Sequence, residues 1–337
     1  MAVSSPGVIQ TVAVTVQRCR AACKAMSHIF TAVKSNGSVI TWGVTDYGGD
    51  STAVQASLQG GITHIYSTGD AFAAVKSDGS VITWGDTDHG GDSTEVQGSL
   101  QSCVTQIYSS EAAFAAVKSD GSVITWGEED RGGNSAAVQA SLQSGITHIY
   151  STVTAFAAVK SDGSVITWGD TDCGGDSAAV QASLQSGVTH IYSADGAFAA
   201  VKSDGSVITW GKEDDGGDSA AVQASLQSGV THIYSTRAAF AAVKSDGSVI
   251  TWGEEDHGGD STAVQASLQS GVTHIYSTRW AFAALKSDGS VITWGDTDYG
   301  RNSAAVQGSL QSGQSEDSSS RRMFVDARVV LGSDLVK

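Results

Sequence analysis

Short apolar runs separated by turn signals recur along almost the whole chain. In one copy, residues 188–193, 197–202 and 206–210 form three runs rich in β-branched and aromatic residues. Asp204-Gly205 separates the second run from the third. An Asp-Gly pair between two apolar runs is typical of a type I′ hairpin turn, in which both central residues take positive φ. Each copy therefore predicts three antiparallel strands.

An acidic, glycine-rich loop follows the third run, and the copy ends with residues 219–229. Ser219 is a residue type that caps helix N-termini, and Gly229 is one that ends helices. Val222 and Leu226, four residues apart, would then face the sheet. We expect a short helix here, and a fourth, edge strand is the alternative.

The whole pattern repeats every 42 residues. Internal periods of this length indicate solenoids, propellers or arrays, and seven copies fit a closed propeller. Both faces of the strand runs are apolar, as expected of sheets that stack face to face. The sequence thus predicts an all-β fold, a seven-bladed β-propeller with about three strands plus a short helix or fourth edge strand per blade. Thr-Trp-Gly marks each copy, at Trp42, Trp84, Trp126, Trp168, Trp210, Trp252 and Trp294.

The repeats cover residues 29–313 and leave a degenerate segment, 1–28, and a polar tail, 314–337. Residues 8–17 and 324–330 have strand-like patterns. We expect one or both to complete the first or last blade, with frayed tails as the alternative. The apolar residues near the N-terminus alternate with polar ones, which predicts neither a signal peptide nor a membrane span.

The net charge indicates which classes of partner to expect, and the cysteine content indicates the cellular compartment. The formal net charge is −16, which disfavours a nucleic acid or an anionic membrane as the main partner and permits a basic protein. The four cysteines have no repeated spacing, so we expect reduced thiols and an intracellular protein, cytoplasmic or nuclear. Cys19-x-x-x-Cys23 is a lone, short motif and only a weak indication of a metal or redox site.

The copies are nearly identical, so the positions at which they differ are informative. One variable zone is the residue pair after Ile-Tyr-Ser-x, and the other is the loop after Trp-Gly. Because strand direction alternates, both zones should fall at one rim and the Asp-Gly hairpins at the other. The loops after Trp-Gly hold 21 of the 35 acidic residues, so the variable rim should be strongly negative. We expect partner binding there, and neutral drift of exposed loops is the alternative.

Trp280 lies outside the Thr-Trp-Gly series, in a variable pair beside Arg279. Tryptophan and arginine are enriched in binding hot spots. Arg237 occupies the position of Arg279 in the preceding copy. The expected partner-binding residues are Arg237, Arg279 and Trp280, with one aspartate from each of five loops: Asp88, Asp130, Asp172, Asp214 and Asp256.

Two kinds of residue raise the question of metal binding. Loops with three carboxylates around a Gly turn suit calcium, but the pattern fails in other copies. A histidine recurs in five copies, as at His190, and ordinary packing or polar contacts are expected of it. No cofactor is expected. The weak calcium candidates are Asp86, Asp88, Asp92, Asp170, Asp172 and Asp176, and the other recurring histidines are His64, His148, His232 and His274.

Catalytic motifs are weak. The recurring Gly-Asp-Ser lacks the strand-turn-helix setting of a nucleophile elbow and any triad partner. Neither a phosphate loop nor a pair of catalytic carboxylates can be argued from the pattern. We therefore expect a monomeric, non-catalytic protein-interaction scaffold rather than an enzyme.

The run Asp-Gly-Ser-Val-Ile-Thr-Trp-Gly resembles the blade signature of the regulator of chromosome condensation propellers. Tyr47-Gly48 and Tyr299-Gly300 match an aromatic-glycine pair that follows Trp-Gly in that family. The resemblance covers residues 30–310 and recurs seven times. Two departures are a shorter repeat and Gly-Gly-Asp-Ser, as at 90–93, where the family has Gly-Gln-Leu-Gly.

The resemblance implies a propeller and several possible activities. Family members include exchange factors for small GTPases, chromatin binders, light receptors and modules of ubiquitin ligases. The exchange activity relies on an inserted β-wedge, and no insertion interrupts the 42-residue spacing here. Guanine-nucleotide exchange or other regulation of a small GTPase is thus one alternative function, and a calcium-binding repeat array is another.

Overall fold

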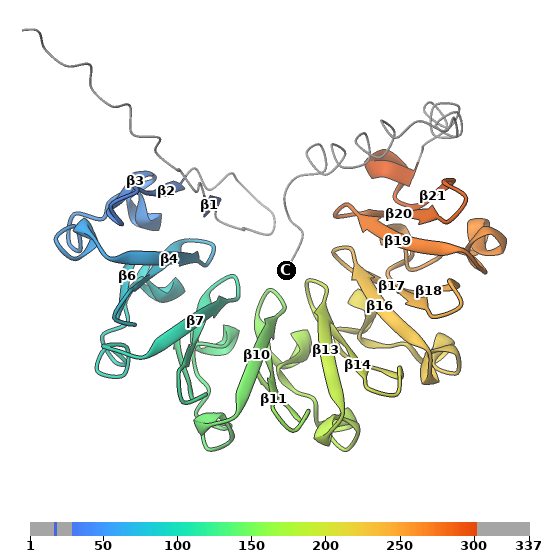
Figure 1. Cartoon of the computed structure of the whole chain (residues 1–337), viewed down its shortest axis with the longest axis horizontal. Coiled ribbons are helices and arrows are strands. Elements are labelled where there is room, and N and C mark those ends of the chain that lie inside the picture. Colours follow the sequence, from blue (N-terminus) through green and yellow to red (C-terminus); the bar gives the residue numbers. More distant parts are fainter. Residues whose placement is uncertain (1–16, 19–28, 302–337) are drawn as a thin grey trace, which may run out of the picture. The chain divides into compact units, whose positions relative to one another are not determined.

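The computed structural model describes residues 17–18 and 29–301. These residues form seven antiparallel sheets of three strands each, one sheet per repeat (Figure 1). In chain order the strands are β1 (Gln17–Arg18), β2 (Ile29–Val33), β3 (Val39–Gly43), β4 (Ile62–Ser67), β5 (Ala71–Lys76), β6 (Val81–Gly85), β7 (Val104–Ser109), β8 (Ala113–Lys118), β9 (Val123–Gly127), β10 (Ile146–Ser151), β11 (Ala155–Lys160), β12 (Val165–Gly169), β13 (Val188–Ser193), β14 (Ala197–Lys202), β15 (Val207–Gly211), β16 (Val230–Ser235), β17 (Ala239–Lys244), β18 (Val249–Gly253), β19 (Val272–Ser277), β20 (Ala281–Lys286) and β21 (Val291–Gly295).

Short helical turns connect the sheets. They follow the third strand of a repeat or precede the first strand of the next. They are η1 (Thr45–Gly49), η2 (Ser57–Gln59), η3 (Thr87–Gly91), η4 (Glu129–Arg131), η5 (Ser141–Gln143), η6 (Thr171–Gly175), η7 (Ala178–Val180), η8 (Ser183–Gln185), η9 (Glu213–Gly217), η10 (Ala220–Val222), η11 (Ser225–Gln227), η12 (Glu255–His257), η13 (Thr262–Leu268) and η14 (Thr297–Arg301).

The middle strands β5, β8, β11, β14 and β17 are buried on both faces along their whole length except for the final lysine. In the sheet β13-β14-β15, Phe198 pairs with Trp210 across the antiparallel register, and their rings stack with centroids 5.1 Å apart. Alanines flank Phe198 in β14, and Ala197, Ala199 and Ala200 are fully buried. The alternation of small and aromatic residues lets successive sheets approach closely, as the apolar pattern predicted.

The hydrophobic core lies between successive sheets. Ala199 and Val201 of β14 pack in one cluster with Ile233 of β16, Phe240 of β17 and the helical-turn residue Leu226. Equivalent clusters recur between other neighbouring sheets. A single repeat cannot bury both of its faces alone, so each depends on its neighbours.

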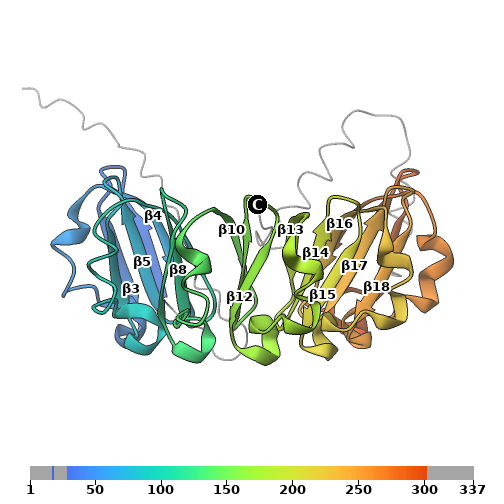
Figure 2. The ribbon, with the colours of Figure 1, turned by 90° about the horizontal axis from the view of Figure 1, so that it is seen from below.

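The seven sheets are the blades of an all-β, seven-bladed propeller, which confirms the predicted fold class. The described residues divide into two compact units: one comprises those up to residue 161 together with 166–170, and the other comprises 162–165 and those from residue 171 onward. Figure 2 shows the blades from the side, with the strands of the second unit in yellow-green to orange. Every contact discussed below lies within one of these units.

The hairpin turn differs from the predicted type I′ turn. Gly205 has φ +76°, but Asp204 is not among the residues with positive φ. The Gly205 N–H donates to Lys202 O and the Lys202 N–H donates to Ser206 O, each at 2.9 Å. These bonds define a three-residue loop that ends in a left-handed glycine. The Asp204 carboxylate accepts the Ser206 N–H at 2.9 Å, and Asn36 accepts from Ser38 in the same way.

The predicted short helix is replaced by 3₁₀ or hydrogen-bonded turns, and two of the described copies have two separate 3₁₀ turns there. In residues 219–229 these turns are η10 and η11, and the Asp218 carboxylate, rather than Ser219, caps the first by accepting the Ala220 N–H at 2.8 Å. The Ser219 hydroxyl instead bonds Thr209 Oγ1 on β15 at 2.9 Å. Leu226 is fully buried, as predicted. The alternative of a fourth strand is wrong for the described residues, whose sheets all have three strands.

The first blade receives its third strand from the N-terminal segment. Gln17 pairs with Thr31 and Arg18 with Phe30, so β1 lies beside β2. Most of the candidate strand 8–17, and all of the candidate strand 324–330, lie outside the described residues. Their closing of the propeller stays a prediction.

Candidate partner-binding rim

The two variable zones of each repeat meet in space. In the blade β16-β17-β18, the Thr236 hydroxyl beside the variable pair donates to His257 O in the loop after Trp-Gly at 3.0 Å. Thr278 and Tyr299 make the same contact in the next blade, at 3.1 Å. In the blade β13-β14-β15, a Cβ built on Gly196 would lie 2.5 Å from Asp215 Oδ2. We call the surface made by these pairs and loops the variable rim.

The variable pairs of neighbouring blades are also joined by backbone hydrogen bonds. The Asp195 N–H donates to Arg237 O at 2.8 Å, and the Arg237 N–H donates to Arg279 O at 3.0 Å. In the first unit, the Glu111 N–H donates to Val153 O at 2.8 Å. The residues that differ between repeats are thus neighbours along the rim within each unit.

Three of the predicted binding residues form one cluster. Arg237 Nε lies 2.8 Å from Asp195 Oδ2, and Arg279 Nη2 lies 3.7 Å from the same oxygen. The guanidinium carbons of Arg237 and Arg279 lie 5.4 and 5.8 Å from the centroid of the Trp280 ring. Both separations fall within the range of cation–π attraction. We call Asp195, Arg237, Arg279 and Trp280 the arginine–tryptophan cluster.

Two aromatic side chains that were not among the predicted binding residues extend this cluster. His257 stacks on Trp280 with ring centroids 4.6 Å apart, and the Tyr299 ring lies 5.5 Å from Trp280. Both belong to the same variable position of the loop after Trp-Gly. That shared position was the signal that could have identified them. Tyr299 is 57% exposed, so an aromatic surface of the cluster faces solvent.

Asp195 is the carboxylate on which the cluster depends. Burial raises the pKa of the Asp195 carboxyl, and the positive charges of Arg237 and Arg279 oppose that rise. Asp215 nearby raises the pKa of Asp195 further, although its own carboxylate lies 3.2 Å from Lys212 Nζ. Asp195 therefore bridges two guanidinium groups from two other blades.

The five predicted aspartates are all exposed. Each occupies the same place in its loop after Trp-Gly: Asp88, Asp130, Asp172, Asp214 and Asp256. The loop around Asp256 also borders a hollow of about 160 Å³. Glu255, Asp256 and Asp260 supply three carboxylates to its wall, and Val264 and Trp294 supply apolar surface.

Charged variable residues of the first unit pair with one another. His89 Nδ1 lies 3.0 Å from Asp86 Oδ1 and 3.5 Å from Asp70 Oδ2. Arg131 Nε lies 3.0 Å from Glu128 Oε2, and its Nη1 lies 3.3 Å from Glu111 Oε2. The guanidinium group of Arg131 is therefore already paired with two carboxylates.

The calcium candidates are not gathered around a common point. Asp86 Oδ1 accepts the N–H groups of Asp88 and His89, at 3.0 and 3.1 Å. Asp92 accepts from Thr94, and Asp176 accepts the N–H of Ala178 at 2.8 Å. In residues 17–18 and 29–301, no group of three or more His, Cys, Asp or Glu side chains could hold a metal ion. The geometry gives no support to a calcium-binding array.

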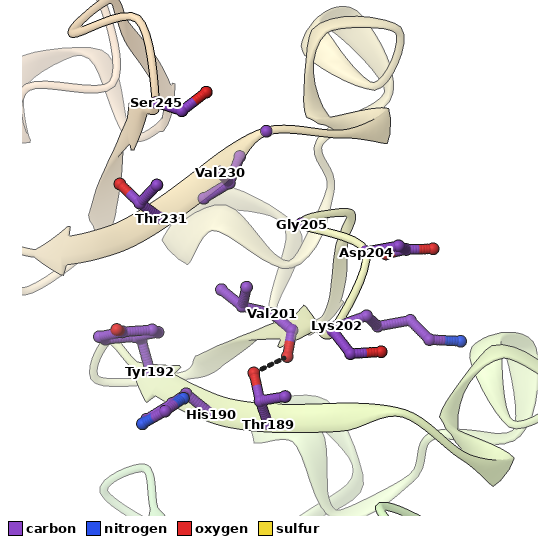
Figure 3. Close-up of a pocket in the computed structure, with 12 residues that line it drawn as sticks. Thr189, His190, Tyr192, Val201, Lys202, Asp204, Gly205, Val230, Thr231 and Ser245 are labelled. Atoms are coloured by element: carbon purple, nitrogen blue, oxygen red, sulfur yellow. Dashed lines mark hydrogen bonds between the residues drawn. The ribbon is translucent and has the colours of Figure 1, made fainter.

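The opposite end of the blades carries a groove made of residues that barely vary between copies. It has a volume of about 460 Å³ and lies between β13, the hairpin after β14, and β16. His190 and Tyr192 extend from β13, Thr231 extends from β16, and Val201 lies between the strands (Figure 3). Of the recurring histidines, His64 and His148 stack on Tyr66 and Tyr150, with centroids 6.3 and 6.4 Å apart. Such packing contacts were expected of them.

Comparisons with known proteins bear on the fold alone. No protein-family model and no curated protein matches the sequence. Similar solved structures include yeast RCC1 (Prp20) bound to Kap60, with 13% identity, 69% of this chain and 70% of that chain covered, and a TM-score of 0.41. The structure of Prp20p from Saccharomyces cerevisiae has 15% identity, 79% and 69% coverage, and a TM-score of 0.37. The computationally designed Ika8 protein has 15% identity, 85% and 84% coverage, and a TM-score of 0.35.

The chain is a seven-bladed β-propeller whose blade sequence resembles that of the regulator of chromosome condensation propellers. The resemblance rests on its repeated blade, in which an Asp-Gly hairpin precedes a strand that ends in Trp-Gly. The identities and scores above transfer no residue role or activity to it. Separately, no helix in the described part of the chain is long and apolar enough to cross a membrane.

Proposed function

We propose that the chain is a non-catalytic, monomeric protein-interaction module that binds a basic partner protein through its variable rim. The hollow lined by Glu255, Asp256 and Asp260 carries this proposal. Three carboxylates in the wall suit an ammonium or guanidinium group, and the apolar surface of Val264 and Trp294 suits the aliphatic stem of lysine or arginine. The interaction would take place inside the cell, in the cytoplasm or the nucleus.

The equivalent loops of other repeats also present carboxylates. Asp88, Asp130, Asp172 and Asp214 occupy the position of Asp256 in their own loops and are exposed. A surface that presents charge of one sign accelerates the encounter with a partner of opposite sign, and salt weakens this effect. The same charge disfavours nucleic acid as the partner.

A labelled hexalysine peptide tests the proposal by fluorescence anisotropy. One variant replaces the five loop aspartates, Asp88, Asp130, Asp172, Asp214 and Asp256, by asparagine. We expect its affinity for hexalysine to fall by about tenfold or more at low salt, because the lost charges face the peptide. A single Asp256→Asn exchange should account for a large share of the loss, since Asp256 borders the hollow.

The chain supplies a control of equal charge. The variant replaces five hairpin aspartates, Asp78, Asp120, Asp204, Asp246 and Asp288, by asparagine. Asn36 already makes the hairpin contact in the first repeat, so this variant should fold normally. Its hexalysine affinity should stay within about twofold of the unmodified chain. Equal losses in the two variants would show that net charge, and not the variable rim, attracts the peptide.

A further inference from the structure

Arg279 has hydrogen-bonding groups that the cluster does not satisfy. Its Nε and Nη2 atoms are buried and have no hydrogen-bond partner. The nearest carboxylate oxygen, Asp195 Oδ2, lies 3.7 Å from Nη2, which is too long for a hydrogen bond. Arg237 differs, because its Nε donates to Asp195 Oδ2 at 2.8 Å.

We propose that Arg279 binds a carboxylate group of a protein partner. The inference goes beyond the proposed function, since it concerns an acidic group on the partner and does not depend on the acidic hollow. Nε and Nη2 lie on one edge of the planar guanidinium group and can donate two parallel hydrogen bonds. The two oxygens of a carboxylate match this geometry.

The arrangement of the cluster leaves Arg279 available for this contact. Asp195 is shared by two guanidinium groups, so one positive charge of the arginine–tryptophan cluster is not balanced by it. The neighbouring Asp215 pairs with Lys212. Arg279 is therefore a cation to which a partner carboxylate adds charge complementarity.

Arg279 can also turn toward a partner without breaking a hydrogen bond at Nε or Nη2. Its side chain keeps 35% of its surface exposed. The Trp280 ring, 5.8 Å from the guanidinium carbon, provides a flat support for it. A partner carboxylate would accept the hydrogen bonds that Nε and Nη2 do not make in the free protein, and this gain favours binding.

Arg131 provides a matched control. It belongs to the variable rim of the first unit, and its side chain is 38% exposed, close to the value for Arg279. Unlike Arg279, it lies 3.0 Å from Glu128 and 3.3 Å from Glu111. A carboxylate on a partner would have to displace these groups, so Arg131 should contribute little.

The test measures the anisotropy of labelled hexaglutamate and hexaglutamine peptides with the full chain. Salt at about 150 mM screens the repulsion between the peptide and acidic groups of the chain that are more than roughly 8 Å away. Hexaglutamate should bind more tightly than hexaglutamine. Arg279→Gln should weaken hexaglutamate binding by about tenfold, whereas Arg131→Gln should change it by less than about twofold. Thermal unfolding of both variants verifies that they fold.

Several outcomes would overturn the inference. Equal binding of the two peptides, or equal losses in the two variants, would remove the role of Arg279. A phosphoserine peptide that binds through Arg279 far more tightly than hexaglutamate would assign the site to phosphate instead. Hexalysine binding by Arg279→Gln should be unchanged, so a failure here remains distinguishable from a failure of the proposed basic partner.

Discussion

The indole Nε1 of Trp252 donates a 3.1 Å hydrogen bond to the carbonyl oxygen of Gly216, which belongs to the preceding blade. Trp210 makes the same bond to Gly174. Gly216 has φ +97°, and a Cβ built on it would lie 2.6 Å from the Phe240 ring. This position therefore requires glycine for two reasons, the backbone conformation and the approach of the next blade.

Replacing Gly216 by alanine should destabilise the protein by about 2 kcal/mol or more, because the left-handed backbone and the clash with Phe240 both oppose a side chain. Urea unfolding measures the change. Gly98→Ala is the control, since a Cβ there meets nothing within 4 Å. Its effect should stay within about 0.5 kcal/mol or be stabilising. Similar losses for the two substitutions would contradict this account of Gly216.

Cys103 holds a backbone conformation that the other repeats assign to glycine. Its φ is +67°, and Gly187 at the equivalent position has φ +78°. Cys103→Gly should therefore stabilise the protein by roughly 0.5–1 kcal/mol, as removal of the side chain relieves a left-handed strain. The reverse exchange, Gly187→Cys, should destabilise it by a similar amount. A stabilised Gly187→Cys variant in thermal unfolding would refute this explanation.

The hairpin aspartates predict how stability depends on acid. The Ser206 hydroxyl, and then its backbone N–H, lower the pKa of the Asp204 carboxyl below its ordinary value, and other hairpins repeat this effect. A carboxyl whose pKa is lower in the folded state stabilises it above the unfolded pKa. That contribution is lost as pH falls through the folded pKa, below about 4.

The five-hairpin Asp→Asn variant described above tests this dependence. Asparagine accepts the same hydrogen bonds but does not titrate in this range. Its melting temperature should fall less between pH 5 and pH 3 than that of the unmodified chain. Parallel curves for the hairpin variant and the unmodified chain would contradict the assignment.

The blade architecture could be predicted because its signals are local. Short apolar runs separated by Asp-Gly pairs specify the strands and their hairpins. Because strand direction alternates, both variable zones then lie at one end of a blade. The turn type could not be predicted in the same way. Asp-Gly fits either a two-residue or a three-residue loop, and Gly205 O also accepts the Val230 N–H of the next blade at 3.0 Å. That contact between blades is invisible in a local pattern.

The candidate site was predicted in part. Arg237, Arg279 and Trp280 were selected for their residue types and variable positions, and they do lie together. The participation of Asp195, His257 and Tyr299 required the spatial juxtaposition of three blades. The prediction of a helix in residues 219–229 was wrong for a related reason. The Ser219 hydroxyl bonds Thr209 on the edge strand instead of capping a helix.

By itself the sequence determined the 42-residue repeat, the strand order within each blade and the end of the blade at which variation gathers. These properties depend on residues close together in the chain, where turn chemistry and apolar periodicity act. Only the tertiary structure decided that Asp195 bonds to Arg237 and leaves Arg279 without a hydrogen bond at Nε and Nη2. The packing of blades sets such contacts, because they join side chains 42 residues or more apart.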